Sequence, residues 1–405
     1  MLKYLKLFPF TFLLIFACAK SQKPEKMILT WWQFWTDPQV RPVITELTAQ
    51  FEKENPNIKV EVTDLTWSDG HEKIVVAFSS NTAPDILELG SDWVPEFSYE
   101  GVLEDVTLEA DKIKDDYLMW EPAIVNNKIS GFPWILDTRV LFYNKDLMKK
   151  VGLDSNHPPQ TWNELLDACQ KINKFKPQVY GFGANAFERH RLYKKFLPFL
   201  WAKGANILSA DFKTCVINSL QAKEALGFYK ELCNSGIIDI QNRLDEMFAQ
   251  GKIGFVISGG WLLKNIQANY PDLNFGVALM PKPSENKGIP ASFAGGEFLV
   301  INEKSKNKQE ALKFIKFLIQ KENSLKLCQA IGSALPSAKG FYYQGNENLK
   351  IFQEQLNFAF SPPAHPKWVY MEEIIEKKIE QVMYDKKTPD HVLDEAKEEI
   401  EQLLK

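Results

Sequence analysis

The sequence contains little arginine and no concentrated run of positive charge. Of its 48 lysine and arginine residues only five are arginine, and the formal net charge is −4. Binding to a phosphate backbone needs a concentrated cationic face, so we expect no nucleic-acid partner. Arginine is also the residue that best makes planar, bidentate contacts to carboxylates and phosphates. Its scarcity disfavours an anionic ligand, although one well-placed arginine suffices to bind one. The five are Arg41, Arg139, Arg189, Arg191 and Arg243.

Common catalytic motifs are also absent from the sequence. HExxH, GxSxG, GxxxxGK[ST] and paired CxxC patterns do not occur, and the stretch that starts at His71-Glu72 lacks the second histidine of a zinc motif. We therefore expect no enzyme, no cofactor and no metal site. A glycoside hydrolase remains an alternative, because it needs only two carboxylates at a set separation, and Asp92, Asp137 and Glu297 are available.

Cysteine is scarce, with five residues whose spacings match no metal-binding pattern. Four of them follow the N-terminal region, and in an oxidising compartment they could pair in three ways. Cys169 and Cys328 fall in helical patterns, which predicts small buried side chains. The four are Cys169, Cys215, Cys233 and Cys328.

The N-terminus has the pattern of an export signal. Two lysines within residues 1–6 precede an almost wholly apolar stretch, residues 7–17, which is too short to span a bilayer comfortably. The stretch ends in Ala17-Cys18, which resembles a bacterial lipoprotein cleavage site. The resemblance implies that residues 1–17 are a signal peptide, that Cys18 is acylated and anchors the chain to a membrane, and that residues 18–26 are a tether. The alternative is a plain signal peptide with an incidental cysteine.

Apolar strands alternate with helices along the rest of the chain. This alternation predicts an α/β fold with parallel pairing, and 405 residues favour two lobes over one domain. The helix at 161–174 begins with a capping box made by Thr161 and Glu164. Strands are predicted at residues 27–34, 58–65, 86–89, 252–257, 274–280 and 297–301. Helices are predicted at 42–54, 70–80, 161–174, 220–234, 308–320, 367–384 and 389–404.

Several short motifs follow one another in the order and near the spacing of a known family. They are Ala83-Pro84-Asp85-Ile86, Gly90-Ser91-Asp92-Trp93, Gly131-Phe132-Pro133-Trp134, Asp137, Leu141-Phe142-Tyr143-Asn144-Lys145, Ile257-Ser258-Gly259-Gly260-Trp261, Gly295-Gly296-Glu297 and Leu335-Pro336-Ser337. Together, over residues 27–405, they resemble the family-1 extracellular solute-binding proteins of bacterial ABC importers, the group that contains the maltose-binding protein. One glycine in the 257–261 motif stands where the family usually has proline.

The resemblance implies a type II periplasmic-binding-protein-like fold, with two α/β lobes joined by three crossings near Asp137, Met280 and Leu335. Lobe 1 would comprise residues 27–137 and 281–334, and lobe 2 residues 138–280 and 335–405. Such lobes close like a hinge on a solute and hide it from water. The implied partners are a small-molecule sugar and the permease subunits of an ABC importer, outside the cytoplasm. We expect a monomer.

The eleven tryptophans suit a sugar ligand. A sugar ring has apolar C–H faces and a rim of hydroxyls, so its site needs aromatic planes together with carboxylates or amides. The resemblance places such carboxylates at Asp92 and Asp137, and stacking tryptophans at Trp261 and Trp368. Asp92 could instead be a helix N-cap and Asp137 a surface carboxylate, and both tryptophans could be core residues. Trp93 stands where the maltose-binding pattern has a cation, which argues against maltose itself.

Further candidates come from loops and strand ends. Alternation puts Trp31 and Trp32 on opposite faces of the first strand, and we assign Trp32 to the cleft. The remaining candidates are Trp67, Trp93, Trp134, Trp201, Gly296 and Glu297.

Two other binding or structural roles are compatible with the chain. A carrier of a phosphorylated polyol such as glycerol phosphate could use Arg189 for its ligand. A structural or adhesive lipoprotein would need no buried cleft.

Overall fold

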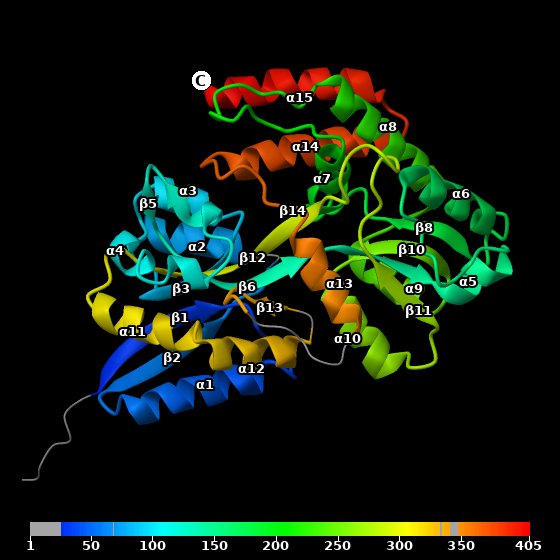
Figure 1. Ribbon diagram of the computed structural model, residues 1–405. Coiled ribbons are helices and arrows are strands. Elements are labelled where there is room, and N and C mark those ends of the chain that lie inside the picture. Colours follow the sequence, from blue (N-terminus) through cyan, green and yellow to red (C-terminus); the bar gives the residue numbers. More distant parts are fainter. Residues whose placement is uncertain (1–25, 68, 333, 341–346) are drawn as a thin grey trace, which may run out of the picture.

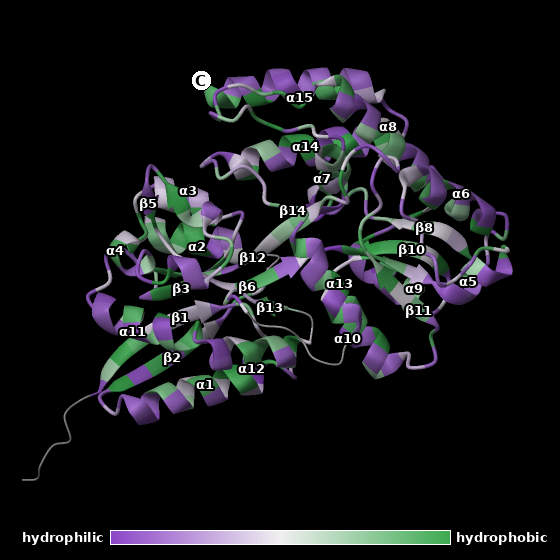
Figure 2. Cartoon of the chain, in the orientation of Figure 1, coloured by the Kyte–Doolittle hydropathy of each residue, from purple (hydrophilic) through white to green (hydrophobic). Residues whose placement is uncertain are grey.

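The computed structural model describes residues 26–67, 69–332, 334–340 and 347–405. The predicted signal peptide and Cys18 lie outside these residues. The described chain forms two lobes, each with a β-sheet at its centre and helices packed around it (Figure 1). Hydrophobic residues concentrate on the strands and on the inner sides of the helices, while hydrophilic residues cover the outer sides (Figure 2).

Lobe 1 contains a mixed sheet in the order β13-β6-β12-β3-β1-β2, with β14 paired to β12. β1 pairs in parallel with both β2 and β3, whereas β12 runs antiparallel to β3 and to β6. The strands are β1 Met27–Gln33, β2 Ile58–Asp64, β3 Ile86–Gly90, β6 Phe132–Thr138, β12 Ser292–Ile301, β13 Leu335–Pro336 and β14 Ala359–Phe360. A separate hairpin joins β4 Ile124–Val125 to β5 Lys128–Ile129.

Helices cover both faces of the lobe 1 sheet (Figure 1). α1 has a proline in its first turn and buries Ile44, Leu47 and Phe51 on one side, as its apolar spacing requires. The helices of this lobe are α1 Arg41–Glu54, α2 Gly70–Ser79, α3 Val94–Tyr99, α4 Thr107–Ala110, α11 Lys308–Leu318 and α12 Lys321–Ile331, with 3₁₀ turns η1 Lys114–Asp116 and η2 Glu121–Ala123.

Lobe 2 contains a second mixed sheet in the order β11-β7-β10-β8-β9. β7 is antiparallel to both of its neighbours, and β10, β8 and β9 are parallel. The strands are β7 Val140–Asn144, β8 Tyr180–Ala184, β9 Gly236–Ile238, β10 Ile253–Ser258 and β11 Phe275–Ala278. The prediction of parallel pairing is therefore right for only part of each sheet, because strands that return from the other lobe enter antiparallel.

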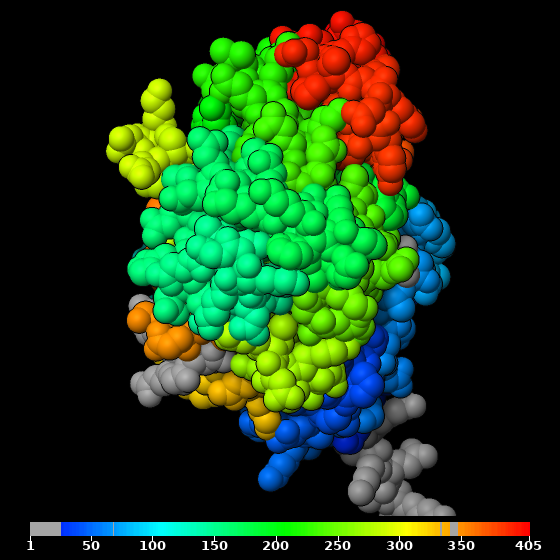
Figure 3. Space-filling view, turned by 90° about the vertical axis from the view of Figure 1, so that its right-hand side faces the viewer, coloured from blue at the N-terminus to red at the C-terminus, as the bar shows by residue number. Residues whose placement is uncertain are grey.

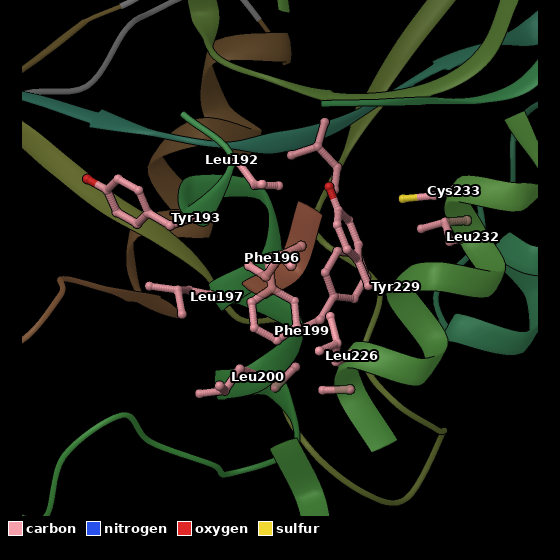
Figure 4. Close-up of a cluster of buried hydrophobic side chains, with 14 of the residues drawn as sticks. Leu192, Tyr193, Phe196, Leu197, Phe199, Leu200, Leu226, Tyr229, Leu232 and Cys233 are labelled. Atoms are coloured by element: carbon pink, nitrogen blue, oxygen red, sulfur yellow. The ribbon is translucent and has the colours of Figure 1, made fainter. Parts of the chain in front are cut away.

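The helices of lobe 2 form its largest apolar core. α7 and α8 pack through rings such as those of Phe196 and Tyr229, whose centroids are 5.9 Å apart (Figure 4). α14 and α15 lie beside them and cap the lobe, as the space-filling view also shows (Figure 3). The helices are α5 Lys145–Lys150, α6 Trp162–Asn173, α7 Tyr193–Ala202, α8 Leu220–Asn234, α9 Gln241–Ala249, α10 Gly260–Asn269, α13 Glu347–Leu356, α14 Trp368–Met383 and α15 Pro389–Leu404.

The chain passes between the lobes three times. The first passage joins β6 to β7, and the second joins β11 to β12. β13 and β14 both pair within the lobe 1 sheet, and α13 between them packs against strands of both sheets, so the third passage follows β14. The sequence prediction assigned residues 335–405 to lobe 2, whereas these pairings place residues 335–336 and 359–360 in the lobe 1 sheet.

Local sequence signals agree closely with the elements observed. Every strand and helix predicted above is present, and α6 has the capping box of Thr161 and Glu164. The strand expected at 297–301 is longer than predicted, since β12 begins at Ser292. All four cysteines of the described chain are free and buried. Among the described helices, none has the length and apolarity needed to cross a membrane.

Candidate ligand-binding site

A cleft of about 640 Å³ is lined by residues of both lobes. On the lobe 1 side, Trp35 comes just after β1, Trp67 just after β2, and the segment from Ser91 to Trp93 just after β3. These three strands are parallel, so their carboxyl ends meet at one edge of the sheet. The fold thereby gathers side chains that are distant in sequence into one wall.

Aromatic rings form much of the lobe 1 wall. The Trp67 ring stacks on Phe34 with centroids 4.2 Å apart and an interplanar angle of 19°, and its centroid lies 5.3 Å from that of Trp93. Trp67 is 40% exposed, whereas Trp93 is only 3% exposed. Phe34 and Trp93 therefore support the Trp67 indole from behind, which leaves it available to a ligand from the cleft.

Trp261, in the first turn of α10, stands on the lobe 2 side of the cleft. Its Nε1 donates a hydrogen bond of 2.7 Å to Asp245 Oδ2. Its ring folds back over Gly259, where a Cβ atom would lie 2.0 Å from the indole. A glycine is therefore required there for this ring position, and the hydrogen bond holds the ring in it.

Asp92 links the two lobes across the cleft. Its Oδ2 accepts a hydrogen bond of 2.8 Å from the Tyr193 hydroxyl of α7 and lies 3.4 Å from Lys194 Nζ. Burial acts to raise the pKa of Asp92, but Lys194 and the Tyr193 hydroxyl outweigh it, and the net pKa is lowered. Asp92 does not cap α3. The N-cap residue of that helix is Trp93, and no side-chain hydrogen bond caps its first turn.

Asp137 lies in the cleft at the end of β6, where the chain first crosses between the lobes. Its Oδ2 accepts a hydrogen bond from Arg139 Nη1, and the two side chains form an ion pair. The Arg139 guanidinium is buried and lies over the Trp261 ring, 4.6 Å from its centroid. Arg139 thus ties an acidic residue of lobe 1 to an aromatic residue of lobe 2.

Glu297 brings a poorly solvated carboxyl to the floor of the cleft. Burial raises its pKa well above the ordinary value, and the nearby carboxyls of Glu88 and Asp137 raise it further. Glu88, on the adjacent strand, is itself buried, and burial raises its pKa to about 8. Within the described chain Glu297 Oε2 is buried and has no hydrogen-bond partner.

Gly296 lets β12 and β6 approach closely next to Glu297. A Cβ atom at this position would lie 2.0 Å from the carbonyl oxygen of Ile135. The glycine therefore contributes space rather than a polar contact to the cleft.

The structure brings seven of the predicted candidates to the cleft and keeps four out of it. The residues in the cleft lining are Trp67, Asp92, Trp93, Asp137, Trp261, Gly296 and Glu297.

Two of the four excluded tryptophans belong to lobe 1 strands. Trp134, inside β6, is fully buried and meets Trp31 edge-on with centroids 5.9 Å apart. Trp32 packs partly buried against the lobe 1 core. Their assignment to the cleft lining is wrong, because both side chains pack against the lobe 1 core instead. Trp35, just after β1, takes the position expected for Trp32.

The other two excluded tryptophans belong to lobe 2 helices. Trp201 is near the C-terminal end of α7 and packs on Phe360, while the N-terminal turn of the same helix faces the cleft. Trp368 is 1% exposed and packs edge-on against Tyr193, with centroids 5.5 Å apart. It therefore lies in the core behind Tyr193 and not on the cleft surface, which corrects its expected position.

Sequence reasoning missed several lining residues. Trp35 had a usable signal, because it follows the first strand directly. Arg139, Lys194 and Lys195 had none, since isolated basic residues are ordinary on helices and loops. Lys195 is 4% exposed and donates a hydrogen bond of 2.8 Å to the carbonyl oxygen of Ile257. Burial lowers the pKa of Lys195 well below the ordinary value, and the positive charge of Arg139 lowers it further.

Two α/β lobes with a cleft where their strands end define a protein that captures a solute between them. The family model of the bacterial extracellular solute-binding proteins matches residues 37–324, and the chain belongs to this family. The predicted family resemblance is therefore confirmed, and with it a location outside the cytoplasm.

Comparisons with individual proteins agree with this family. An ABC transporter solute-binding protein from Thermotoga lettingae, solved with α-D-tagatose bound, is 27% identical, covers 94% of this chain and 100% of its own, and has a TM-score of 0.83. The galactooligosaccharide-binding protein of Bacillus subtilis is 26% identical over 94% of this chain and 90% of its own length. The sn-glycerol-3-phosphate-binding periplasmic protein of Salmonella paratyphi A is 25% identical over 94% of each chain.

Proposed function

We propose that this protein binds an oligosaccharide in the cleft, closes its two lobes around it and delivers it to an ABC importer. The observation that carries the proposal is the pairing of indole rings with carboxyl groups on facing walls. Trp67 and Trp261 come from different lobes, and Asp137 and Glu297 lie in the same lining. Indole faces suit the apolar faces of sugar rings, and carboxyl oxygens suit the hydroxyl rim.

The polar groups of the cleft also give a basis for selectivity. A buried polar group left without a partner costs about 1–3 kcal/mol, so a solute that lacks the matching hydroxyl is rejected. The carboxyl group of Glu297, which lines the cleft, is such a group. The names of the Thermotoga and Bacillus relatives, which specify tagatose and galactooligosaccharides, support a carbohydrate ligand.

A titration with mono- and oligosaccharides tests the proposal directly. Calorimetry on the purified chain is expected to show saturable binding of at least one saccharide, with a change in tryptophan fluorescence, since Trp67 and Trp261 would contact it. A ligand that binds only the folded chain also raises its melting temperature, which gives a rapid screen. No response across a broad saccharide panel would contradict the proposal, and formation of cleavage products would indicate a hydrolase instead.

A phosphorylated polyol remains the second candidate ligand. Arg139, Arg189 and Arg191, three of the five arginines, line the cleft. The Salmonella relative is named for sn-glycerol 3-phosphate. Including glycerol 3-phosphate in the same titration separates the two candidates.

We also propose that the chain is a lipoprotein, acylated at Cys18 after removal of residues 1–17. The support is the charged-then-apolar pattern that ends at Ala17-Cys18. In a bacterial host, Cys18→Ser is expected to move the protein from the membrane fraction to the soluble extracytoplasmic fraction, because the acyl chains would be lost. The measurement is fractionation followed by immunoblotting. Retention of the variant with membranes would refute acylation at this residue.

A further inference from the structure

The lobe 2 wall of the cleft carries an excess of positively charged side chains. Arg189, Arg191, Lys194 and Lys195 all line it, from the loop before α7 and the first turn of that helix. Among the described residues that line this wall, Glu188 alone has a carboxylate. The acidic and aromatic lining residues Asp92, Trp67 and Trp93 are on the opposite wall, so the cleft is electrostatically asymmetric.

Most of these cations already have a partner within the protein. Arg191 Nε lies 3.4 Å from Glu188 Oε1, and Lys194 Nζ lies 3.4 Å from Asp92 Oδ2. Lys195 donates to a backbone carbonyl, as described above. Within the described chain Arg189 makes no hydrogen bond and no ion pair, and its side chain is exposed in the cleft. Arg189 therefore keeps its donors for a ligand.

The loop that contains Arg189 is held in place by contacts with α14. His190 has a φ of +62°, an uncommon value for a residue with a side chain. Its backbone N–H donates a 3.0 Å hydrogen bond to Glu376 Oε2, and its Nδ1 lies 2.6 Å from Glu372 Oε1, both carboxyls being on α14. With His190 turned toward α14, Arg189 and Arg191 stand on either side of it at the cleft. The arrangement is preorganised, as an unusual backbone conformation at a binding site often is.

The two carboxyls that hold the loop are shielded from solvent. Both are buried, Glu372 at 1% and Glu376 at 7% exposure. Burial raises the pKa of Glu372 well above the ordinary value, and the nearby carboxyl of Asp92 raises it further. Burial also raises the pKa of Glu376, which together with the effect of the Glu372 carboxyl brings it to about 7. Both shifts favour the neutral, protonated form of the carboxyl, and this weakens the negative field that the two groups exert on the loop.

We propose that the lobe 2 wall is a subsite for an anionic group, and that the solute is an acidic saccharide whose carboxylate or phosphate contacts Arg189. This rests on the proposed carbohydrate-binding function and narrows its substrate class. An arginine fork matches the two oxygens of either group. The sugar ring of such a ligand would lie against the indoles of the opposite wall, with its acidic group toward the loop before α7.

A rival role for Arg189 is a latch between the lobes. Glu72, at the start of α2, also lines the cleft, and it makes no ion pair in the described structure. If closure merely paired Arg189 with Glu72, loss of either side chain would weaken every ligand equally. An anion subsite predicts instead that only acidic ligands depend on Arg189.

The test uses calorimetry on matched neutral and acidic probes. The pairs are galactose oligomers against galacturonate oligomers, glucose oligomers against their glucuronate-containing counterparts, and glycerol against glycerol 3-phosphate. We expect the acidic member of at least one saccharide pair to bind at least tenfold more tightly than the neutral one. Its affinity should fall as salt is raised, because salt screens the charge contact.

Substitutions then locate the subsite. Arg189→Gln should weaken binding of the acidic saccharide by roughly 10- to 100-fold and leave the neutral counterpart within about twofold. Arg189→Lys should recover part of the loss. Arg243→Gln is the matched control, because Arg243 is on the same lobe, pairs with Asp239 and is not in the cleft lining. Under the anion subsite, Glu72→Gln should not reproduce the selective loss of acidic ligands that Arg189→Gln causes.

Each outcome separates the subsite from the wider function. Neutral saccharides that bind as tightly as acidic ones would overturn the anion subsite but keep the carbohydrate function. Equal losses for neutral and acidic ligands in Arg189→Gln and Glu72→Gln would also overturn it, in favour of a latch. Arg189-dependent binding of glycerol 3-phosphate without any saccharide would support the subsite and overturn the carbohydrate function. Absence of binding throughout would overturn both.

Discussion

Replacing Trp261 with alanine is expected to weaken saccharide binding by about 1–3 kcal/mol, or roughly a 5- to 150-fold rise in Kd. The indole lies at the cleft surface in the first turn of α10, so its loss removes an apolar platform without opening the main core. The thermal midpoint should also fall, because the variant loses the Nε1 hydrogen bond to the buried Asp245. Calorimetry on the variant, with a saccharide that the wild-type protein binds, measures the effect.

The surroundings of Trp261 provide the control for this experiment. Trp261→Phe keeps an aromatic plane but loses the Nε1 hydrogen bond to Asp245, so its affinity should fall between those of the wild type and the alanine variant. Arg139 would still have an aromatic ring beneath its guanidinium. Unchanged affinity in Trp261→Ala would show that the ligand does not use this wall, and the proposed pocket would have to be abandoned.

Replacing Trp368 with alanine is expected to lower the free energy of unfolding by about 3–5 kcal/mol, the usual cost of deleting a large buried aromatic side chain. Trp368 is 1% exposed at the start of α14 and contacts Tyr193, which in turn donates to Asp92. Urea-induced unfolding followed by circular dichroism measures the loss.

Trp368 is expected to affect stability, whereas Trp261 is expected to affect ligand affinity. Trp368→Phe should cost clearly less, because the ring fills part of the space and Trp368 Nε1 has no hydrogen-bond partner within the described residues to lose. If Trp368→Ala retained wild-type stability but lost affinity, Trp368 would be a ligand contact, as the family resemblance implied, and its placement in the core would be contradicted.

Local patterns were sufficient for the secondary structure. The helix predicted at 220–234 is α8 with the same bounds, and the Thr161 and Glu164 cap starts α6 as expected. These features depend on residues three or four positions apart, which are neighbours in any helix. Short motifs in order were likewise sufficient to identify the family, because each marks a strand end or turn that the fold reuses.

The sequence could not decide which aromatic residues face the cleft. Trp31 meets Trp134 and Trp368 meets Tyr193, and each of these contacts joins segments more than 100 residues apart. An indole has the same composition in a core as on a binding surface, and only the packing of distant segments distinguishes the two. The resemblance to the family placed Trp261 well and Trp368 poorly for this reason.

The sequence by itself thus determined the α/β elements, their order, the family and the regions from which a cleft would be built. Tertiary structure alone decided that Trp35 replaces Trp32 in the lining, that Asp92 bonds to Tyr193, and that Arg189 stays unpaired among the described residues. The physical reason is that periodicity and capping act within a few residues. Burial, hydrogen-bond partners and local charge depend on what the other lobe brings to the same place.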